Sequence, residues 1–468
     1  MTNKLFSNRI TVAWMITASA VSLFFCSSIR HFLFQSTALD LALFEQWTYL
    51  ISQGLPPISS LFGFHVLGDH AALIFYPIAL LYKIYPNVHL LFAVQAIALA
   101  IGAIPVYALS VQSGLSVVYA QAIALSYLLY PSLFNSNFYT DFRPEAIAIP
   151  ALLWAMWAGI GGKSWQLAIA VVLTLSCKDT LSLTIVACGI WLLLIQRPRY
   201  GLGCIVAGIV WFGVTVGYFV PMLRTGQAGG VVFYASLGSS PAEILQRLIT
   251  EPSLILTKLF QPDTLFYYLL LVLPVIIGLH WRQGIYAIPA LPMLLLNVLS
   301  DYPAQRDLIH HYSLPIFPFL IVWLLHSIKY YKKSQKRPWL NQRLLIIWAL
   351  ITFLLLAKYD FFFTRYLTKI NRLDSLYTAV NLVQTHDSVL TTAKTAPHLS
   401  ERQNIQIIHN SKEQKAILQN FQYILIDALD VDKENTPEYL IELVYQLKNK
   451  PEFQLTYQQD DVYLFKKQ

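Results

Sequence analysis

The chain has 468 residues, 56% of them hydrophobic and only 12% charged, and its mean hydropathy is +0.52. Because a soluble domain carries about 25% charged residues, this composition excludes a soluble globular enzyme and a disordered chain. The formal net charge of +8 does not indicate a nucleic-acid partner, because the basic residues are distributed among loops between apolar runs.

Apolar runs of about 15–23 residues recur along the chain, and about 20 such residues cross a bilayer as a helix. We therefore predict a mainly α, polytopic helical membrane protein with about eleven spans. The predicted transmembrane domain covers residues 1–363 and has a long first outer loop at residues 30–87. Its expected spans are Ile10–Ile29, Val88–Ser110, Ser116–Phe134, Ala146–Ile160, Trp165–Cys177, Thr180–Gln196, Leu202–Met222, Leu265–Trp281, Ile285–Leu299, Ser313–Ile328 and Leu344–Phe363.

The run Ala71–Tyr85 is borderline, and we interpret it as an interfacial or re-entrant helix. If this run crossed the membrane instead, every later loop would change sides. The cysteines all lie inside apolar runs, so neither a disulfide framework nor a metal cluster is indicated. They are Cys26, Cys177, Cys188 and Cys204.

The basic residues indicate an orientation for these spans. With the N-terminus in the cytoplasm, the cytoplasmic loops are short and rich in Lys and Arg, most strongly at Lys329–Arg343, as the positive-inside rule requires. The run Ile10–Ile29 is too long for the apolar core of a signal peptide, so we expect a retained anchor. After an odd number of spans, the residues that follow Phe363 lie outside the cytoplasm.

Residues 364–468 are polar and close to neutral, and strand-like runs alternate with helical patterns there. This alternation predicts a small extracytoplasmic α/β domain, and its length is sufficient for independent folding. The expected strands are Ser388–Thr392, Ile405–Ile408, Tyr423–Ile426 and Val462–Lys466, and the expected helices are Leu373–Gln384 and Pro437–Lys448.

Carboxylates, histidines and cations gather in the loops assigned to the outer side, whereas the inner loops hold almost no carboxylates or histidines. Ionisable residues clustered on one membrane face indicate a functional site. The candidates are Asp40, Glu45, Asp69 and His70 in the first outer loop, Asp141, Arg143 and Glu145 in the second, Lys178 and Asp179 in the third, and Arg306, His310 and His311 in the last.

Each candidate also has a structural interpretation. Thr37 and Asp40 form a T-x-x-D pattern, which is typical of a capping box, so Asp40 could simply begin a juxtamembrane helix over Leu41–Ile51 that Gly54 ends. Glu45 lies five positions after Asp40, and the two carboxylates do not share a helix face.

The other candidates have equally simple explanations when taken singly. Arg143 could form a local ion pair at a helix start, Lys178 and Asp179 could form a charged turn between two spans, and the histidine pair could be an interfacial anchor. Their concentration on one face favours a functional site over these separate roles.

The order of these features resembles the GT-C glycosyltransferases, which are polytopic enzymes with an acidic residue near the start of a long first outer loop. More closely, the chain is similar to an uncharacterised bacterial membrane family, described as a domain of unknown function and grouped with GT-C folds. The segments that carry this resemblance are A-L-D-L-A-L-F-E-Q-W at Ala38–Trp47, H-V-L-G-D-H at His65–His70, A-I-P-V-Y at Ala103–Tyr107, Y-T-D-F-R-P-E at Tyr139–Glu145, C-K-D-T-L at Cys177–Leu181, H-H-Y-S-L-P-I-F-P-F-L at His310–Leu320, and Ala396–Ile408 with P-H-L-S-E-R.

The resemblance implies an inverting glycosyl transfer from a polyprenyl-phosphate sugar at the outer face of a bacterial cytoplasmic membrane. In such a reaction Asp40, or Glu45, would deprotonate the acceptor hydroxyl. Arg143, Lys178 and Arg306 would offset the charge of the leaving phosphate. The remaining candidates would complete the substrate site.

Two departures from the family limit what can be transferred. Members often have histidine where this chain has Arg143, and often K-E-D where it has Lys178 and Asp179, so no histidine role applies at 143. Many GT-C enzymes have a second carboxylate two positions after the first, whereas position 42 is alanine here. A single carboxylate is a poor site for a divalent cation, so no cofactor is firmly indicated.

Two other classes of protein stay open at this stage. A transporter or flippase for a lipid-linked solute would require charges at mid-membrane depth and repeated halves, and the sequence has few of the former and no repeat. A non-catalytic membrane scaffold would depend on the C-terminal domain and not on Asp40.

Overall fold

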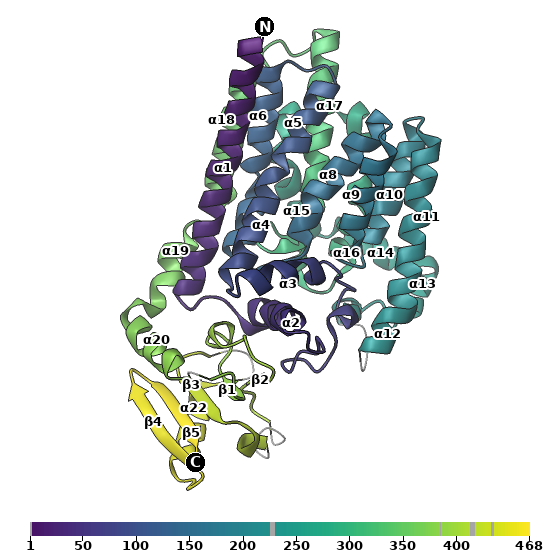
Figure 1. Ribbon diagram of the computed structural model, residues 1–468. Helices are drawn as coiled ribbons and strands as arrows, with labels where there is room; N and C mark the ends of the chain where they lie inside the picture. The colour runs from purple at the N-terminus through teal and green to yellow at the C-terminus, as the bar shows by residue number, and fades with distance from the viewer. Residues whose placement is uncertain (1, 225–229, 384, 412–416, 432–434) are drawn as a thin grey trace. The chain divides into compact units, whose positions relative to one another are not determined.

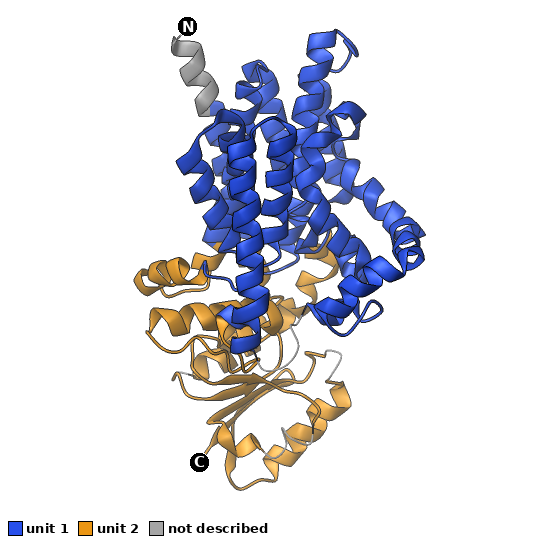
Figure 2. Ribbon diagram, turned by 90° about the vertical axis from the view of Figure 1, so that its right-hand side faces the viewer, with its two compact units in different colours: residues 1–25, 67–74, 93–359 blue, residues 26–66, 75–92, 360–468 orange. Residues whose placement is uncertain are grey.

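The computed structural model describes residues 2–224, 230–383, 385–411, 417–431 and 435–468. These residues form two compact units, which are coloured separately in Figure 2. Unit 1 comprises residues 1–25, 67–74 and 93–359, and unit 2 comprises residues 26–66, 75–92 and 360–468. Whether residues 364–468 fold independently stays a prediction.

Unit 1 is helical (Figure 1). Its α-helices are α1 (Thr2–Phe32, which continues into unit 2), α4 (His89–Ile101, which begins in unit 2), α5 (Ala103–Gln112), α6 (Val117–Leu128), α7 (Pro131–Phe138), α8 (Glu145–Gly161), α9 (Ser164–Leu175), α10 (Leu181–Leu194), α11 (Pro198–Val214), α12 (Val220–Leu223), α13 (Pro241–Thr250), α14 (Pro252–Phe260), α15 (Pro262–Val272), α16 (Leu291–Leu299), α17 (Phe317–Ser334) and α18 (Gln342–Leu356). Short helices η2 (Val66–Gly68), η3 (Thr215–Phe219), η4 (Val231–Tyr234), η5 (Ile276–Gly278), η6 (Trp281–Ala290), η7 (Pro303–Arg306) and η8 (His311–Ser313) connect them.

Five helical stretches of the described residues are long and apolar enough to cross a membrane: Thr11–Phe32, His89–Gln112, Val117–Phe138, Pro198–Leu223 and Gln342–Leu382. Several other expected spans are shorter apolar helices, among them Glu145–Gly161, Ser164–Leu175 and Leu181–Leu194. The borderline run Ala71–Tyr85 contains α3 (Phe75–Ile84), whose 10 residues rise only about 15 Å. That is half of a roughly 30 Å hydrocarbon core.

Two of the expected spans that lie outside these five long stretches are not continuous α-helices. The run Leu265–Trp281 is α-helical only to Val272; Pro274 follows, and the short 3-10 helix η5 comes after it. The run Ile285–Leu299 begins as the 3-10 helix η6 and becomes α-helical only at Leu291, with prolines at 289 and 292. Proline removes a backbone donor and clashes with the preceding turn, which explains why these apolar runs are not continuous helices.

Helices α10 and α11 pack with their backbones in close approach. A Cβ atom on Gly189 would lie 2.6 Å from the carbonyl oxygen of Gly201, and one on Gly208 would lie 2.6 Å from that of Ser182. Small residues let apolar helices approach closely where no hydrophobic effect drives them together. Glycine at these positions therefore fixes the α10–α11 pair.

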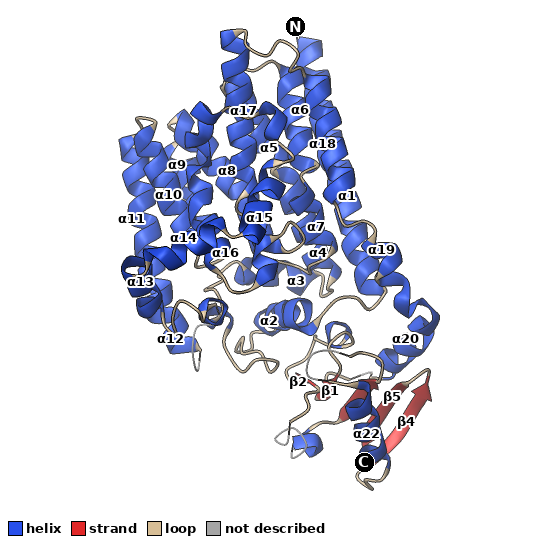
Figure 3. Cartoon of the chain, turned by 180° about the vertical axis from the view of Figure 1, so that it is seen from behind, coloured by secondary structure: helices blue, strands red, loops and turns tan. Residues whose placement is uncertain are grey.

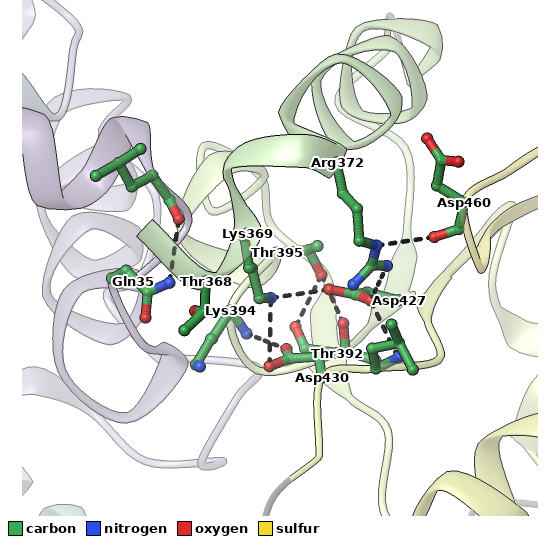
Figure 4. Close-up of polar contacts among 12 residues, drawn as sticks. Gln35, Thr368, Lys369, Arg372, Thr392, Lys394, Thr395, Asp427, Asp430 and Asp460 are labelled. Atoms are coloured by element: carbon green, nitrogen blue, oxygen red, sulfur yellow. Dashed lines mark hydrogen bonds and ion pairs between the residues drawn. The ribbon is translucent and has the colours of Figure 1, made fainter. Parts of the chain in front are cut away.

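Unit 2 contains all strands of the described residues, in a five-stranded sheet of order β2-β1-β3-β5-β4 (Figure 3). Strands β1 (Val389–Thr391), β2 (Ile405–Ile407) and β3 (Tyr423–Asp427) are parallel, whereas β5 (Val462–Lys467) and β4 (Phe453–Gln459) are antiparallel. The helices of unit 2 are η1 (Ala38–Ala42), α2 (Leu43–Ser52), α3, α19 (Phe361–Thr364), η9 (Tyr366–Arg372), α20 (Leu373–Leu382), η10 (Ala396–His398), η11 (Leu418–Asn420) and α22 (Pro437–Lys448).

The four strands and two helices expected in residues 364–468 are confirmed within one or two residues, except that Gln384 lies outside the described residues. Strand β4 was not expected from the sequence. Each buried strand points alternate side chains to opposite faces of the sheet, so that Leu425 faces one core and Ile424 the other.

The two faces of the sheet have different covers. Leu440, Leu443 and Leu447 of α22 pack on one face. On the other, Leu376 and Ala379 of α20 are joined by Phe34, Ala38 and Ala42 from the first loop. Residues far apart in the sequence thus share one hydrophobic core.

Gln46 of α2 adds a buried polar link within unit 2. Its side chain is fully buried, and its amide nitrogen donates to Ser60 Oγ at 2.8 Å and to the carbonyl oxygen of Arg402 at 3.1 Å. Its amide oxygen accepts from Ser59 Oγ at 2.7 Å. The first loop and the segment before β2 are therefore joined by specific hydrogen bonds as well as by apolar packing.

We predict that Gln46→Ala lowers the free energy of unfolding by about 2 kcal/mol, because each buried polar partner left without a hydrogen bond costs about 1–3 kcal/mol. Chemical denaturation of the detergent-solubilised protein measures this change. Gln53→Ala is the matched control, since Gln53 is on the same segment but exposed. Equal stability of the two variants would contradict the role of Gln46.

Candidate functional site

The candidate residues from the sequence fall into both units. Asp40 and Glu45 belong to unit 2, and the other ten belong to unit 1. In unit 1, ion pairs join side chains from separate segments into two sets, which meet at the sequence neighbours Lys178 and Asp179 and which we together call the charged cluster. It consists of Asp69, His70, Glu145, Lys178, Asp179, Arg224 and His311.

His70 is at the centre of one half of the charged cluster. Its Nδ1 lies 3.3 Å from Asp179 Oδ1, its Nε2 lies 3.9 Å from Asp69 Oδ2, and Arg224 holds the other oxygen of Asp69 at 3.2 Å. Burial alone would lower the pKa of His70, but the carboxylates of Asp69 and Asp179 outweigh it, and the net effect raises the pKa. The two carboxylates therefore favour the protonated form of this imidazole.

The backbone around His70 is held in an unusual conformation. His70 and Ala71 have φ angles of 59° and 47°, in a left-handed region that non-glycine residues rarely occupy. The Asp179 amide donates to the His70 carbonyl oxygen at 2.9 Å, and the Ile74 amide donates to that of Ser176 at 2.9 Å. These bonds fix the 70–74 segment against the 176–179 turn, which accounts for the left-handed residues.

The other half of the charged cluster is an ion pair between Lys178 and Glu145. Lys178 Nζ lies 2.5 Å from Glu145 Oε1, and both side chains are nearly buried. His311 Nε2 approaches the same carboxylate oxygen at 3.9 Å. Each of these side chains comes from a different connecting segment, so Lys178 does not simply form a charged turn with its neighbour.

A buried polar chain positions the segment before Glu145. The Arg143 amide donates to Gln95 Oε1 at 2.7 Å, the Gln95 amide nitrogen donates to Asn137 Oδ1 at 3.2 Å, and Asn137 donates to the Leu23 carbonyl oxygen at 2.8 Å. Gln95 and Asn137 are almost fully buried. A polar side chain inside an apolar run is the signal that could have identified Gln95 from the sequence.

The remaining candidates of unit 1 lie near the charged cluster or on its segments. Asp141 is buried, two residues before Arg143. His310 Nδ1 lies 2.7 Å from Asp307 Oδ2, and its ring packs edge-on against Tyr139. Arg306 donates to the carbonyl oxygen of Ser300 and is not among the ion-paired residues of the cluster. Arg224 was missed by the sequence analysis, because its loop showed no accompanying pattern.

No group of three or more His, Cys, Asp or Glu side chains that could hold a metal ion occurs among the described residues. The four cysteines are free. The charged cluster offers cations, carboxylates and imidazoles, which suit contacts with a phosphate group and the movement of protons.

In unit 2, Asp40 lies in η1, a single turn of π-helix that runs directly into α2. Ala38, Leu41 and Ala42 around it are buried, and Asp40 is half-buried. Thr37 is at the N-cap position in extended backbone, but its side chain forms no cap hydrogen bond. Single π-turns inside helices are rare and frequent at functional sites, which favours a role for Asp40 beyond starting the helix.

Glu45 has a different environment from Asp40. It is 2% exposed, and its Oε2 accepts from Ser400 Oγ at 2.6 Å. The hydroxyl of Tyr82 lies 2.9 Å from Glu45 Oε1 and 2.6 Å from Glu401 Oε1. One hydroxyl has one proton to donate, so both contacts are hydrogen bonds only when one carboxyl is protonated.

Burial, followed by the neighbouring charge of Glu401, raises the pKa of Glu45 to about 8. Glu45 is therefore the protonated partner near neutral pH, donating to Tyr82, which in turn donates to Glu401. A protonated and buried carboxyl does not suit a general base, so these contacts favour a positioning role for Glu45 and leave Asp40 as the base candidate.

Comparison with known proteins identifies the family. A family model described as a predicted membrane protein, DUF2079, matches residues 30–464, and the chain therefore belongs to this family of membrane proteins. The expected resemblance to an uncharacterised membrane family is thereby confirmed. The comparison with curated proteins gave no match.

Among solved structures, the crystal structure of ArnT from Cupriavidus metallidurans bound to undecaprenyl phosphate is similar to this chain. The sequence identity is 10%, the match covers 97% of each chain, and the TM-score is 0.49. A TM-score below 0.5 does not establish a common fold.

We predict that Glu45→Gln reduces the pH dependence of stability. A carboxyl whose pKa rises from 4.5 to about 8 on folding stabilises the native state fully below the lower value and loses that contribution as the pH rises through the higher one. The wild-type protein should lose stability between about pH 5 and pH 8, as measured by thermal unfolding, and the variant should lose less. Identical slopes would exclude a protonated Glu45.

We also predict that Lys178→Met lowers the free energy of unfolding by about 3–5 kcal/mol, because it leaves the buried carboxylate of Glu145 without its partner. The double variant Lys178→Met/Glu145→Leu should recover most of that loss, since it removes both charges. Chemical denaturation of the two variants measures the difference. A double variant no more stable than the single one would contradict a direct Lys178–Glu145 pair.

Proposed function

We propose that this DUF2079 member is a membrane glycosyltransferase, which moves a sugar from a polyprenyl-phosphate-linked donor to an acceptor at the outer face of the membrane. In this proposal the chain crosses the membrane about eleven times, with its N-terminus in the cytoplasm and residues 364–468 outside. The sugar and the acceptor are left open.

The observation that carries the proposal is the charged cluster. Cations, carboxylates and an imidazole from separate segments converge in a protein that contains several long apolar helices. Charged groups buried away from water are costly unless they are paired, and ionisable residues gathered in a membrane protein often mark a functional site. A phosphate-linked lipid is a substrate that requires both an apolar surface and local positive charge.

In the proposed transfer, Asp40 and the cations of unit 1 have distinct roles. Asp40 is the base that removes the proton from the acceptor hydroxyl as the glycosidic bond forms. The bond from the anomeric carbon to the phosphate oxygen breaks, and the polyprenyl phosphate leaves with the electron pair. No carboxylic acid is needed at the leaving group, because a phosphate leaves as an anion that cations stabilise.

Lys178 and Arg143 are the cations that we assign to the leaving phosphate, with His70 and Arg224 as further donors. Lys178 is paired with Glu145, so a bound phosphate would share or replace that carboxylate. Arg306 has a weaker claim to this role than the sequence suggested, because its guanidinium donates to a backbone carbonyl oxygen.

The location of the charged cluster argues against a transporter. A transporter for a lipid-linked solute would be expected to have charges inside its apolar runs and two repeated halves. Here Glu145 begins a helix, Lys178 and Asp179 lie between two helices, and Arg224 follows a helix. A scaffold protein would not require ionisable residues to be gathered in this way.

We predict that Asp40→Asn lowers sugar transfer by about a hundredfold or more, the contribution of a general base. The measurement is mass spectrometry of polyprenyl-phosphate sugars in cells lacking the gene, complemented with the wild-type or the variant chain. One lipid-linked sugar should accumulate both in the deletion strain and in the Asp40→Asn strain.

Asp263→Asn is the matched control, because Asp263 is an exposed carboxylate in another segment of the chain and should restore the wild-type lipid profile. Immunoblots of membranes check that the variants are present in equal amounts. An unchanged lipid profile in the deletion strain would rule out the glycosyltransferase and direct attention to the transporter or scaffold. A normal profile with Asp40→Asn alone would remove only the base assignment.

A further inference from the structure

A basic cavity lies in unit 1, where α17 ends and the chain turns back toward α18. Its volume is about 490 Å³. The exposed side chains of Lys332, Lys336 and Arg337 line it, and no carboxylate is among its lining residues. We call this cavity the basic pocket.

Among the residues that the structure describes, the three cations of the basic pocket have no acidic partner. Within the described part of the chain, none of them forms an ion pair with a carboxylate. The dipole of α17 accounts for Lys332, which lies in the last helical turn, because cations stabilise a helix C-terminus. It does not account for Lys336 and Arg337, which follow the helix.

The basic pocket has an apolar and aromatic base. Ile328, Tyr331 and Leu340 line it and are buried. The Tyr331 hydroxyl donates to the carbonyl oxygen of Leu279 at 2.9 Å, which fixes the ring. A bound molecule would therefore meet positive charge at the rim and hydrocarbon below it.

Two of the cations are held in place by aromatic rings. Lys332 Nζ lies 4.5 Å from the centre of the Tyr119 ring, and the Arg337 guanidinium lies 4.8 Å from that of Tyr331. Arg337 also donates to the carbonyl oxygen of Ile277 at 3.1 Å. Cation–π contacts of this kind order a long side chain without neutralising its charge, so the pocket stays positive.

The turn that forms the basic pocket is conformationally restricted. Gln335 and Arg337 have φ angles of 51° and 55°, although neither is glycine. Left-handed residues of this kind persist where the surrounding contacts determine the backbone, as at ligand-binding turns. The pocket is thus a preformed feature of the α17–α18 connection.

We propose that the basic pocket binds the phosphate of an anionic phospholipid headgroup. The connection runs directly into Gln342, where one of the candidate membrane spans begins, so the cavity is at the end of a membrane-crossing helix. Trp339 beside it is 54% exposed, and exposed tryptophan is typical of the headgroup level. Basic pockets between helices at that level accept anionic headgroups.

The test is native mass spectrometry of the full-length protein released from nanodiscs of equimolar phosphatidylglycerol and phosphatidylcholine. The wild-type protein should retain phosphatidylglycerol selectively. The variant Lys332→Gln/Lys336→Gln/Arg337→Gln should lose that selectivity by roughly a hundredfold, since each basic residue near an anionic headgroup contributes about a factor of five.

The matched control is Lys163→Gln/Arg197→Gln/Arg199→Gln, which removes three exposed cations outside the pocket. This control should retain phosphatidylglycerol as the wild type does, and an equal loss in both variants would overturn the proposal. The single variant Lys336→Gln, whose side chain contacts no aromatic ring in the described structure, should weaken retention about fivefold without affecting folding.

Inorganic phosphate distinguishes a lipid from a free anion. If millimolar phosphate displaces the retained phosphatidylglycerol completely, the pocket is a site for free phosphate and the lipid assignment is wrong. If phosphate has no such effect, the headgroup and its glycerol backbone are bound together, as the apolar base of the pocket predicts. This test is independent of the glycosyltransferase activity.

Discussion

Unit 2 depends on the burial of both faces of its sheet. Strands β1, β2 and β3 are parallel, and a parallel sheet must be covered on both faces. One face is covered by α22, and the other by α20 together with Phe34, Ala38 and Ala42 of the first loop. The first loop is therefore part of the domain core and not a flexible connection. Because Asp40 lies between two of these buried alanines, packing against the sheet determines where its carboxylate is held.

This shared core also explains why two distant segments of the chain carry the family resemblance. Glu45 accepts a hydrogen bond from Ser400, and Gln46 donates to the backbone of Arg402. The segments Ala38–Trp47 and Ala396–Ile408 thus pack in the same core and are joined by hydrogen bonds. Replacing Glu45 or Gln46 by an apolar residue would leave a buried polar partner in the other segment without its hydrogen bond, so these contacts couple the two segments without any role in chemistry.

Composition and local pattern were sufficient to predict the apolar helices, the α2 helix and most strands of the tail, because each depends on its own periodicity. Strand β4 was missed because it is an edge strand in which only Phe453 is buried. The discontinuous units could not be predicted either. Residues 67–74 belong with the helices of unit 1 through backbone hydrogen bonds from Asp179 and Ile74, and a local pattern carries no information about such long-range partners.

For the candidate site too, the residue types could be predicted from the sequence, whereas the long-range contacts between them could not. The sequence identified most members of the charged cluster by their residue types, but not the pairing of Lys178 with Glu145, nor the contribution of Arg224. Burial makes unpaired charges costly, so each carboxylate in the cluster holds a cation from another segment. An anion that bound Lys178 would compete with Glu145, the first residue of α8. A phosphate that bound Lys178 would therefore affect the position of the start of α8, because Lys178 would pair with the phosphate instead of with Glu145.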